Sequence, residues 1–355
     1  MRHKTNRIKI GNIAIGGDEP IAIQSMLSCP PTDIDANIRQ AKNLESAGCE
    51  ILRVAIPDKG SVQLVEILKN NVSMPIVADI HFDYRLALDC AAAGVDKIRI
   101  NPGNIGSDEK VKAVADICRL KNIPIRIGVN SGSVEKHILA KYGRPTPQAL
   151  VESALYHASL LEKFDFENIA ISMKSVDVPS MLEAYRIAAD SCVYPLHLGV
   201  THTGVARMGL VKSAMGIGGL LLEGIGDTLR VSLAADPVEE IRAAKDILLA
   251  SGISRKWPEI IACPTCGRAG IDVIDLANKV DLALKDCTVP VVVAVMGCVV
   301  NGPGEAREAD LGIAGGNGTG ILFAKGKVVK KVPQEEILST LLEEISKFEK
   351  ENAAV

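Results

Sequence analysis

Residues 97–130 read KIRINPGNIGSDEKVKAVADICRLKNIPIRIGVN, two short β-branched runs separated by one amphipathic stretch. The runs 97–102 and 124–130 have the composition of strands, and 107–121 has the spacing of a helix. The same unit repeats in both directions along the chain. Further strands are predicted at 21–26, 51–56, 75–81, 168–174, 195–201 and 228–233, with helical stretches such as 33–47, 84–93 and 147–163 between them.

Eight strand–helix units within about 235 residues are typical of a (β/α)8 barrel of the TIM type. Gly48, Gly94 and Gly252 follow helical stretches, where a left-handed residue ends a helix. A doubly wound open sheet is the alternative, but it normally has fewer strands. We therefore predict an α/β fold with an N-terminal TIM-type barrel over residues 1–252. The longest gap between strands, SGSVEKHILAKYGRPTP at 131–147, would lie on the C-terminal face of the barrel.

A second, smaller α+β domain is predicted over residues 259–355, after a linker at 253–258 (ISRKWP). Its predicted strands are 259–262, 289–296, 320–324 and 327–332, and its predicted helices are 272–285 and 334–350. Between the strands 289–296 and 320–324 lies a Gly-rich stretch, 301–320, to which no strand is assigned.

Cations alternate with apolar residues along several barrel strands, at Arg53, Arg99, Arg126 and Arg230, and Lys174 ends another strand. The apolar face of a barrel strand packs against the helices outside, so these cations should point toward the barrel axis. An unpaired buried ion costs about several kcal/mol, and Asp79 alone cannot compensate five cations. Each cation could pair with a loop carboxylate instead. We favour a polyanionic ligand, most naturally a diphosphate held by guanidinium groups.

Other polar residues share these strands. Asp79 and His81 lie on one face of a strand, and Asn130 ends the strand that carries Arg126. His81 and His197 could bind a metal, but two histidines without a third partner more often form hydrogen bonds. Asn130 could bind substrate or stabilise a turn.

Nine cysteines form no disulfide framework in a chain of this length. Those of the barrel are isolated, whereas Cys263-Pro-Thr-Cys266 and Cys298, in MGCVVNGPGE, lie in the second domain. Thiols in this pattern could hold zinc, form a redox dithiol or bind an iron–sulfur cluster. We favour the cluster, because glycines around Cys298 leave backbone N–H groups free to approach sulfide. Cys287 or Glu305 could supply a fourth ligand.

The composition argues against binding to nucleic acid or membranes. Forty Lys and Arg residues against 43 Asp and Glu give a net charge of −3, and only five Phe, five Tyr and one Trp are present. The N-terminus lacks the apolar segment of a signal peptide, and the longest apolar run, 289–300, is too short for a bilayer span. A cytoplasmic location is expected.

Along the chain occur, in this order, the motifs QSM, RVAIPD, ADIHFD, KIRINPGN, RIGVNSGS, SMKS, HLGVTHTG, DTLRVSL, ACPTCGR and MGCVVNGPGEA. In these motifs the chain resembles the bacterial 4-hydroxy-3-methylbut-2-enyl diphosphate synthases, the IspG or GcpE family, over essentially its whole length. The resemblance implies reductive ring opening and dehydroxylation of 2-C-methyl-D-erythritol 2,4-cyclodiphosphate, in non-mevalonate isoprenoid biosynthesis.

The resemblance also implies site residues and partners. A [4Fe-4S] cluster would be held by Cys263, Cys266, Cys298 and Glu305, and Glu305 is the candidate catalytic proton donor. Flavodoxin or ferredoxin would deliver the electrons, and a head-to-tail homodimer would bring the second domain of one subunit to the barrel of the other. The substrate-binding residues would be Arg53, Asp79, His81, Arg99, Arg126, Asn130, Lys174, Arg230 and Ser232.

Two alternatives remain open from the residues alone. A phosphate-binding barrel aldolase or pterin-type transferase with a structural zinc would keep the arginines but show no redox activity. A non-enzymatic iron–sulfur sensor would keep the cluster but gives no reason for five inward cations.

Overall fold

The computed structural model describes residues 2–285, 287, 289–298, 304, 306–316 and 318–352. The chain divides into two compact units, Met1–Ser251 and Gly252–Val355. Each unit is described by itself. Among the described helices, none combines the length and the apolar character that crossing a bilayer requires.

The first unit is a parallel eight-stranded barrel. The last strand of the barrel, β10, pairs with both β3 and β9. A parallel bridge between Ile171 and Leu196 joins β8 to the segment that leads into β9, and this bridge closes the barrel. The predicted barrel is confirmed, and the open sheet is wrong. The strands are β3 (Ala22–Met26), β4 (Ile51–Ala55), β5 (Ile76–Asp79), β6 (Lys97–Ile100), β7 (Ile125–Asn130), β8 (Ile169–Lys174), β9 (His197–Leu198) and β10 (Thr228–Leu229).

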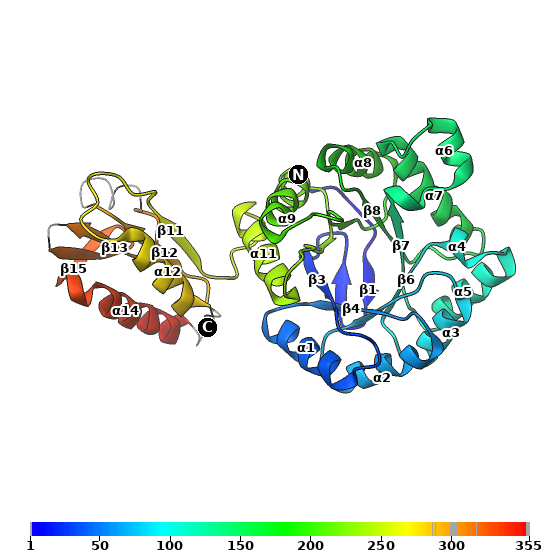
Figure 1. Cartoon of the computed structure of the whole chain (residues 1–355), viewed down its shortest axis with the longest axis horizontal. Helices are drawn as coiled ribbons and strands as arrows, with labels where there is room; N and C mark the ends of the chain where they lie inside the picture. Colours follow the sequence, from blue (N-terminus) through cyan, green and yellow to red (C-terminus); the bar gives the residue numbers. More distant parts are fainter. Residues whose placement is uncertain are drawn as a thin grey trace. The chain divides into compact units, whose positions relative to one another are not determined.

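Helices form a ring around the strands (Figure 1). Several of them begin at a residue whose side-chain oxygen accepts a hydrogen bond from a first-turn backbone N–H, as Asp33, Asp177 and Asp236 do. The main outer helices are α1 (Ile34–Ser46), α2 (Gln63–Lys69), α3 (Tyr84–Ala92), α5 (Asp108–Leu120), α7 (Pro147–Glu162), α8 (Val178–Ser191), α9 (Ala206–Ser213) and α11 (Pro237–Ala250). Shorter helical segments are η1 (Lys59–Val62), α4 (Pro102–Ile105), η2 (Ser131–Ser133), α6 (Lys136–Tyr142), η3 (Ala214–Gly218) and α10 (Gly219–Leu222).

A hairpin that the sequence did not predict closes the amino-terminal end of the barrel. It consists of β1 (Ile8–Ile10) and β2 (Ile13–Ile15), paired antiparallel. Its isoleucines pack in one apolar cluster with residues from the beginnings of four barrel strands, namely Ala22, Ile51, Val77 and Ala170. The open end of the barrel interior is therefore the carboxyl end, where barrel enzymes carry their sites.

The second unit contains one five-stranded sheet in the order β11-β12-β13-β14-β15. The first three strands are parallel, and β14 and β15 add antiparallel strands. Two helices share one apolar core with the sheet. The elements are β11 (Glu259–Ala262), α12 (Val273–Leu284), β12 (Val292–Met296), β13 (Leu311–Gly316), β14 (Thr319–Ala324), β15 (Lys327–Pro333), η4 (Gln334–Glu336) and α14 (Ile337–Asn352).

Strand β13 lies in the Gly-rich stretch 301–320, to which the sequence analysis assigned no strand. Its glycines are required by close packing rather than by a turn. A Cβ on Gly312 would lie 2.3 Å from Cζ of Phe323, and a Cβ on Gly315 would lie 2.5 Å from Cγ1 of Ile271. Glycine in a strand therefore marks close approach of a neighbour at these two positions.

Candidate functional site

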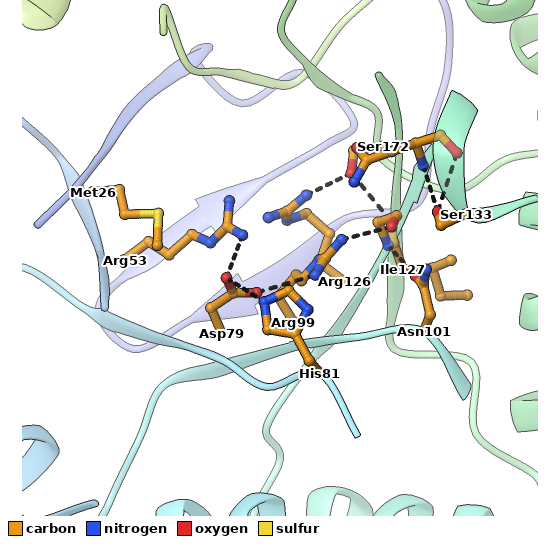
Figure 2. Close-up of polar contacts among 12 residues, drawn as sticks. Met26, Arg53, Asp79, His81, Arg99, Asn101, Arg126, Ile127, Ser133 and Ser172 are labelled. Atoms are coloured by element: carbon orange, nitrogen blue, oxygen red, sulfur yellow. Dashed lines mark hydrogen bonds and ion pairs between the residues drawn. The ribbon is translucent and has the colours of Figure 1, made fainter. Parts of the chain in front are cut away.

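Three arginines lie side by side in the barrel interior. Arg53 comes from β4, Arg99 from β6 and Arg126 from β7, and their side chains point toward one another (Figure 2). The register places Arg99 beside Arg126 and Asp79 beside Arg99. Their relative exposures are 9%, 6% and 1% in chain order. The predicted inward orientation of these three cations is confirmed.

Asp79, at the end of β5, joins two of the arginines. Its Oδ2 lies 2.6 Å from Nη2 of Arg53, and its Oδ1 lies 3.3 Å from Nη1 of Arg99. His81 contacts the same carboxylate at 3.5 Å, although its own side chain is 55% exposed. Burial opposes ionisation of Asp79, but Arg53, His81 and Arg99 outweigh it and hold the pKa of the carboxyl well below its usual range. The carboxylate therefore stays charged and fixes two guanidinium groups.

Arg230 has a partner that the sequence analysis missed. The carboxylate of Glu240, on α11, is buried and lies 3.4 Å from Nε of Arg230. The same carboxylate accepts hydrogen bonds from Ser25 Oγ and from the backbone N–H of Leu233. A helix residue, and not a loop residue, thus compensates this cation. The signal available in the sequence was the position of an acidic residue in the helix that follows the strand.

Arg126 and Lys174 have no carboxylate partner among the described residues. Nη1 of Arg126 donates to Ser172 Oγ at 2.5 Å, whereas its Nε and Nη2 are buried without a partner in the described part of the chain. Burial, together with Arg53 and Arg99, lowers the pKa of Arg126 well below its ordinary value. Burial and the surrounding arginines, Arg230 foremost, also lower the pKa of Lys174 well below its ordinary value. Both cations gain from a bound anion.

Further polar groups lie in the barrel interior. Lys97, two residues before Arg99 on the same face of β6, is completely buried and its Nζ has no partner among the described residues. The sequence analysis did not name it, although the period of two that identified Arg99 includes it. His197 Nδ1 lies 2.8 Å from Thr228 Oγ1. Burial and the cations Arg126 and Lys174 lower the pKa of His197, so its imidazole is neutral.

The remaining predicted residues lie at the ends of strands. Asn130 ends β7, and its backbone N–H donates to Ser133 Oγ at 3.1 Å. Asn101, which follows β6, is buried. Its Oδ1 accepts a hydrogen bond from Gly128 N–H at 3.0 Å. Ser232 follows β10, and its carbonyl accepts a hydrogen bond from Thr203 Oγ1 at 2.7 Å. Arg53, Asp79, Arg99 and Arg126 are thus in one contiguous group, whereas Asn130 is the last residue of β7 and Ser232 lies beyond the end of β10.

The cysteines of the second unit follow two adjacent parallel strands. Cys263 comes directly after β11, and Cys298 comes two residues after β12. The backbone N–H of Cys263 donates to Val295 O at 3.1 Å, and Gly297 N–H donates to the Sγ atom of Cys263 at 3.1 Å. Since parallel strands end at the same edge of a sheet, the structure brings both cysteines to one edge.

Cys266 and Cys287 differ in their surroundings. Cys266 is exposed, and hydrogen bonds from the backbone and the side chain of Arg268 lower the pKa of its thiol. Cys287 follows the far end of α12, and burial, with a hydrogen bond to Glu349, raises the pKa of its thiol to about 11. Cys266 therefore suits a thiolate ligand and Cys287 does not.

We call the sheet edge that carries Cys263 and Cys298 the cysteine edge. It fits the chemistry of an iron–sulfur cluster. A backbone N–H directed at a thiolate sulfur, as from Gly297 to Cys263, is the type of hydrogen bond that cluster sulfurs receive. The predicted fourth ligand, Glu305, lies outside the described residues. No group of three His, Cys, Asp or Glu residues arranged to hold a metal ion occurs within the described ranges, and His81 and His197 form none.

Solved structures with a similar fold cover the barrel. The dihydropteroate synthase of Yersinia pestis matches with a TM-score of 0.51 and 12% identity, covering 69% of this chain and 98% of that one. The type I 3-dehydroquinate dehydratase of Clostridium difficile matches with a TM-score of 0.51 and 14% identity, covering 70% and 98%. At these identities the likeness shows the barrel fold alone.

Sequence relatives cover both units. A protein of Clostridium perfringens named 4-hydroxy-3-methylbut-2-en-1-yl diphosphate synthase (flavodoxin) is 55% identical, over 96% of this chain and 98% of its own length. A protein of Fusobacterium nucleatum with the same name is 56% identical, over 98% and 97%. The family model of the GcpE TIM-barrel domain matches residues 5–245, and that of the GcpE protein C-terminal domain matches residues 259–347. The chain therefore belongs to the GcpE family.

Proposed function

We propose that this chain is an oxidoreductase, a 4-hydroxy-3-methylbut-2-enyl diphosphate synthase. Its substrate is 2-C-methyl-D-erythritol 2,4-cyclodiphosphate, whose ring is opened and dehydroxylated with two electrons in isoprenoid biosynthesis. Relatives more than half identical over nearly the whole chain carry this name. The observation that carries the proposal is the excess of buried cations over carboxylates in the barrel interior.

The barrel residues would bind and orient the cyclic diphosphate. Asp79 holds Arg53 and Arg99 in fixed positions, so their guanidinium groups would bind the ligand with little further loss of side-chain freedom. Arg126 offers N–H donors that have no partner among the described residues. These guanidinium groups can each form two parallel hydrogen bonds with phosphate oxygens. The other proposed ligand residues are His81, Asn130, Lys174, Arg230 and Ser232.

The second unit would hold a [4Fe-4S] cluster. Cys263, Cys266, Cys298 and Glu305 are the proposed ligands, and residues 259–355 form the proposed cluster domain. When bound, such a cluster supplies electrons one at a time. The hydrogen bond from Gly297 to Cys263 and the lowered pKa of Cys266 both favour thiolates.

Glu305 is the proposed proton donor for the hydroxyl group that leaves. A carboxyl group placed beside the reacting C–O bond can protonate the departing oxygen. The Glu305→Gln variant should keep part of the cluster but lose turnover. Substantial turnover by that variant would contradict this role.

The electron donor and the assembly are also proposed. The relatives' names indicate a flavodoxin, and ferredoxin is the other candidate. A head-to-tail homodimer, in which the barrel (1–252) of one subunit meets the cluster domain of the other across the linker 253–258, would bring cluster and substrate together. Mixing an Arg126 variant with a Cys298 variant tests this, because activity returns only if sites are shared between chains.

The first experiment is metal analysis of protein purified without oxygen. About four iron and four acid-labile sulfide per chain, lost in a Cys298 variant, support the cluster. Stoichiometric zinc without sulfide would favour the barrel aldolase or transferase instead. A cluster in a protein that binds no cyclodiphosphate would favour the sensor.

A further inference from the structure

One buried histidine contacts both of the loops that follow β6 and β7. His157, on α7, is completely buried. The backbone N–H of Gly103, in α4 just after β6, donates to Nδ1 of His157 at 3.0 Å. The other ring nitrogen, Nε2, lies 2.5 Å from Oε1 of Glu135, which precedes α6 in the loop after β7. The two nitrogens of one imidazole therefore connect two separate loops.

The contacts define the protonation of the ring. Nδ1 accepts a hydrogen bond from an amide, so the proton of the neutral imidazole lies on Nε2, which faces a carboxylate. Burial opposes ionisation of Glu135, but the neighbouring His157 and Ser153 outweigh it and lower its pKa below the ordinary value. One imidazole ring thus contacts both loops at the same time.

The packing around the ring leaves no room for adjustment. A Cβ on Gly103 would lie 2.6 Å from Cε1 of His157, so this position requires glycine as long as the histidine is present. The backbone of Gly103 is not in the left-handed region, so the requirement comes from the ring and not from the conformation. Helix α7 packs against β7 and β8, which fixes the histidine to the barrel wall.

Both loops begin beside the cationic site. The first follows Arg99 and contains Asn101, whose side chain binds the backbone of β7. The second starts at Asn130, which follows Arg126 on the same strand, and η2 forms there. The arginines are held by the barrel strands, whereas Ser133, whose Oγ hydrogen-bonds the backbone of Asn130 at the end of β7, lies in the second loop.

We propose that His157 is a positioning residue for the diphosphate site, holding the loops after β6 and β7 at the spacing in which Asn130 reaches the ligand. The inference rests on the proposed function. It assigns His157 no contact with the substrate and no proton transfer. Its effect is on affinity, through the geometry of the rim.

Two nearly isosteric variants separate the two contacts. His157→Asn keeps an acceptor near the position of Nδ1 and removes the group facing Glu135, whereas His157→Gln keeps a donor near Nε2 and removes the acceptor for Gly103. With the holoenzyme, each variant should raise KM for the cyclodiphosphate about tenfold, the effect of one lost buried hydrogen bond, with kcat within about twofold of wild type. Calorimetry without an electron donor should show the same loss in Kd.

Amide hydrogen exchange supplies a readout that does not depend on turnover. His157→Asn should speed exchange in residues 131–135, and His157→Gln should speed it in residues 102–106. Unchanged KM and Kd in both variants would overturn the proposal. Faster exchange throughout the barrel with parallel losses of kcat would also overturn it, because that pattern belongs to a general structural role.

Matched variants control for the substitution itself. His137→Asn, on α6, alters a histidine that makes an edge-to-face contact with Tyr156 and should leave KM unchanged. Gly103→Ala should raise KM, but combined with His157→Ala it should cost nothing further, since the clash is gone. Additive effects of the two substitutions on KM would contradict the positioning role proposed for His157. If the wild type neither binds nor reduces the cyclodiphosphate, the proposed function fails, while hydrogen exchange still tests the link between the loops.

Discussion

The barrel interior and the cysteine edge differ in how firmly the fold positions the side chains that are proposed to bind. In the barrel, Arg99 and Arg126 are buried on strands, and Asp79 neutralises part of the charge before any substrate arrives. At the cysteine edge, the candidate ligands follow strands, and Cys266 is exposed. The barrel site is therefore organised by the fold, whereas the cysteine edge would gain its final order from the group that it is proposed to bind.

The largest effect is expected for Cys298→Ser. Loss of one thiolate should remove most iron and sulfide, and reduction should fall by about a thousandfold or more, because the electron route is lost. Binding of the cyclodiphosphate, measured by calorimetry, should stay within twofold of wild type. A Cys298→Ser protein with full iron content and turnover would break the comparison, since the edge would then not need that thiolate.

Arg126→Met tests the barrel site, the other side of the comparison. The substitution removes buried charge-assisted hydrogen bonds, so affinity for the cyclodiphosphate should fall by about a hundredfold while iron and sulfide stay at wild-type levels. Arg186→Met, which removes a surface pair with Glu223, is the matched control and should change neither quantity. Loss of the cluster in the Arg126 variant would show that the two sites are not built independently.

Gly312→Ala should affect only the second unit. The added Cβ would lie 2.3 Å from the Phe323 ring. Relieving that overlap should lower the free energy of unfolding of this unit by about 1–3 kcal/mol, as overpacking does. Thermal unfolding followed by calorimetry should show a shift in one transition. The control is Gly267→Ala, where a Cβ would meet no atom within 4 Å. A shift in the barrel transition as well would contradict separate unfolding.

The smallest effect is expected in the number of protons taken up when the cyclodiphosphate binds. Burial and the neighbouring cations, Arg230 foremost, lower the pKa of Lys174 in the free protein. An anion favours the protonated amine, so binding raises that pKa, takes up protons and weakens as the pH rises through the free-protein pKa. Calorimetry in buffers of different ionisation enthalpy should show uptake of less than about one proton, reduced in Lys174→Met. Proton release on binding would be the opposite sign and would refute this account.

The sequence was sufficient for the barrel and for the inward cations. Alternation with a period of two is a local property, so Arg53, Arg99 and Arg126 could be placed without knowing any partner. Glu240 could not be assigned to Arg230, because that pairing depends on how α11 packs against the barrel. No strand was assigned where β13 lies, because its glycines give no strand pattern, and only the position of Phe323 explains Gly312.

The cysteine edge was predictable only in part. Spacing identified Cys263, Cys266 and Cys298 as candidate thiol ligands, and the parallel pairing of β11 with β12 explains why Cys263 and Cys298 share an edge. Spacing alone could not exclude Cys287, whose raised pKa reflects burial and Glu349. The link from His157 to two loops was also beyond sequence reasoning, since Gly103 and Glu135 are neighbours only in space.

The closure of the barrel has a consequence for how the chain folds during synthesis. Strand β3 pairs with β10, with Ala22 beside Thr228. One of the first strands to leave the ribosome therefore cannot complete its pairing until the last barrel strand has been synthesised. Contacts of such long range slow folding and leave strand edges exposed meanwhile. The strands that bear Arg53, Asp79 and Arg99 are consecutive, so their ion pairs can form while the nascent barrel is still open. The acid at the end of β5 thus relieves cationic repulsion during assembly, long before a substrate is bound.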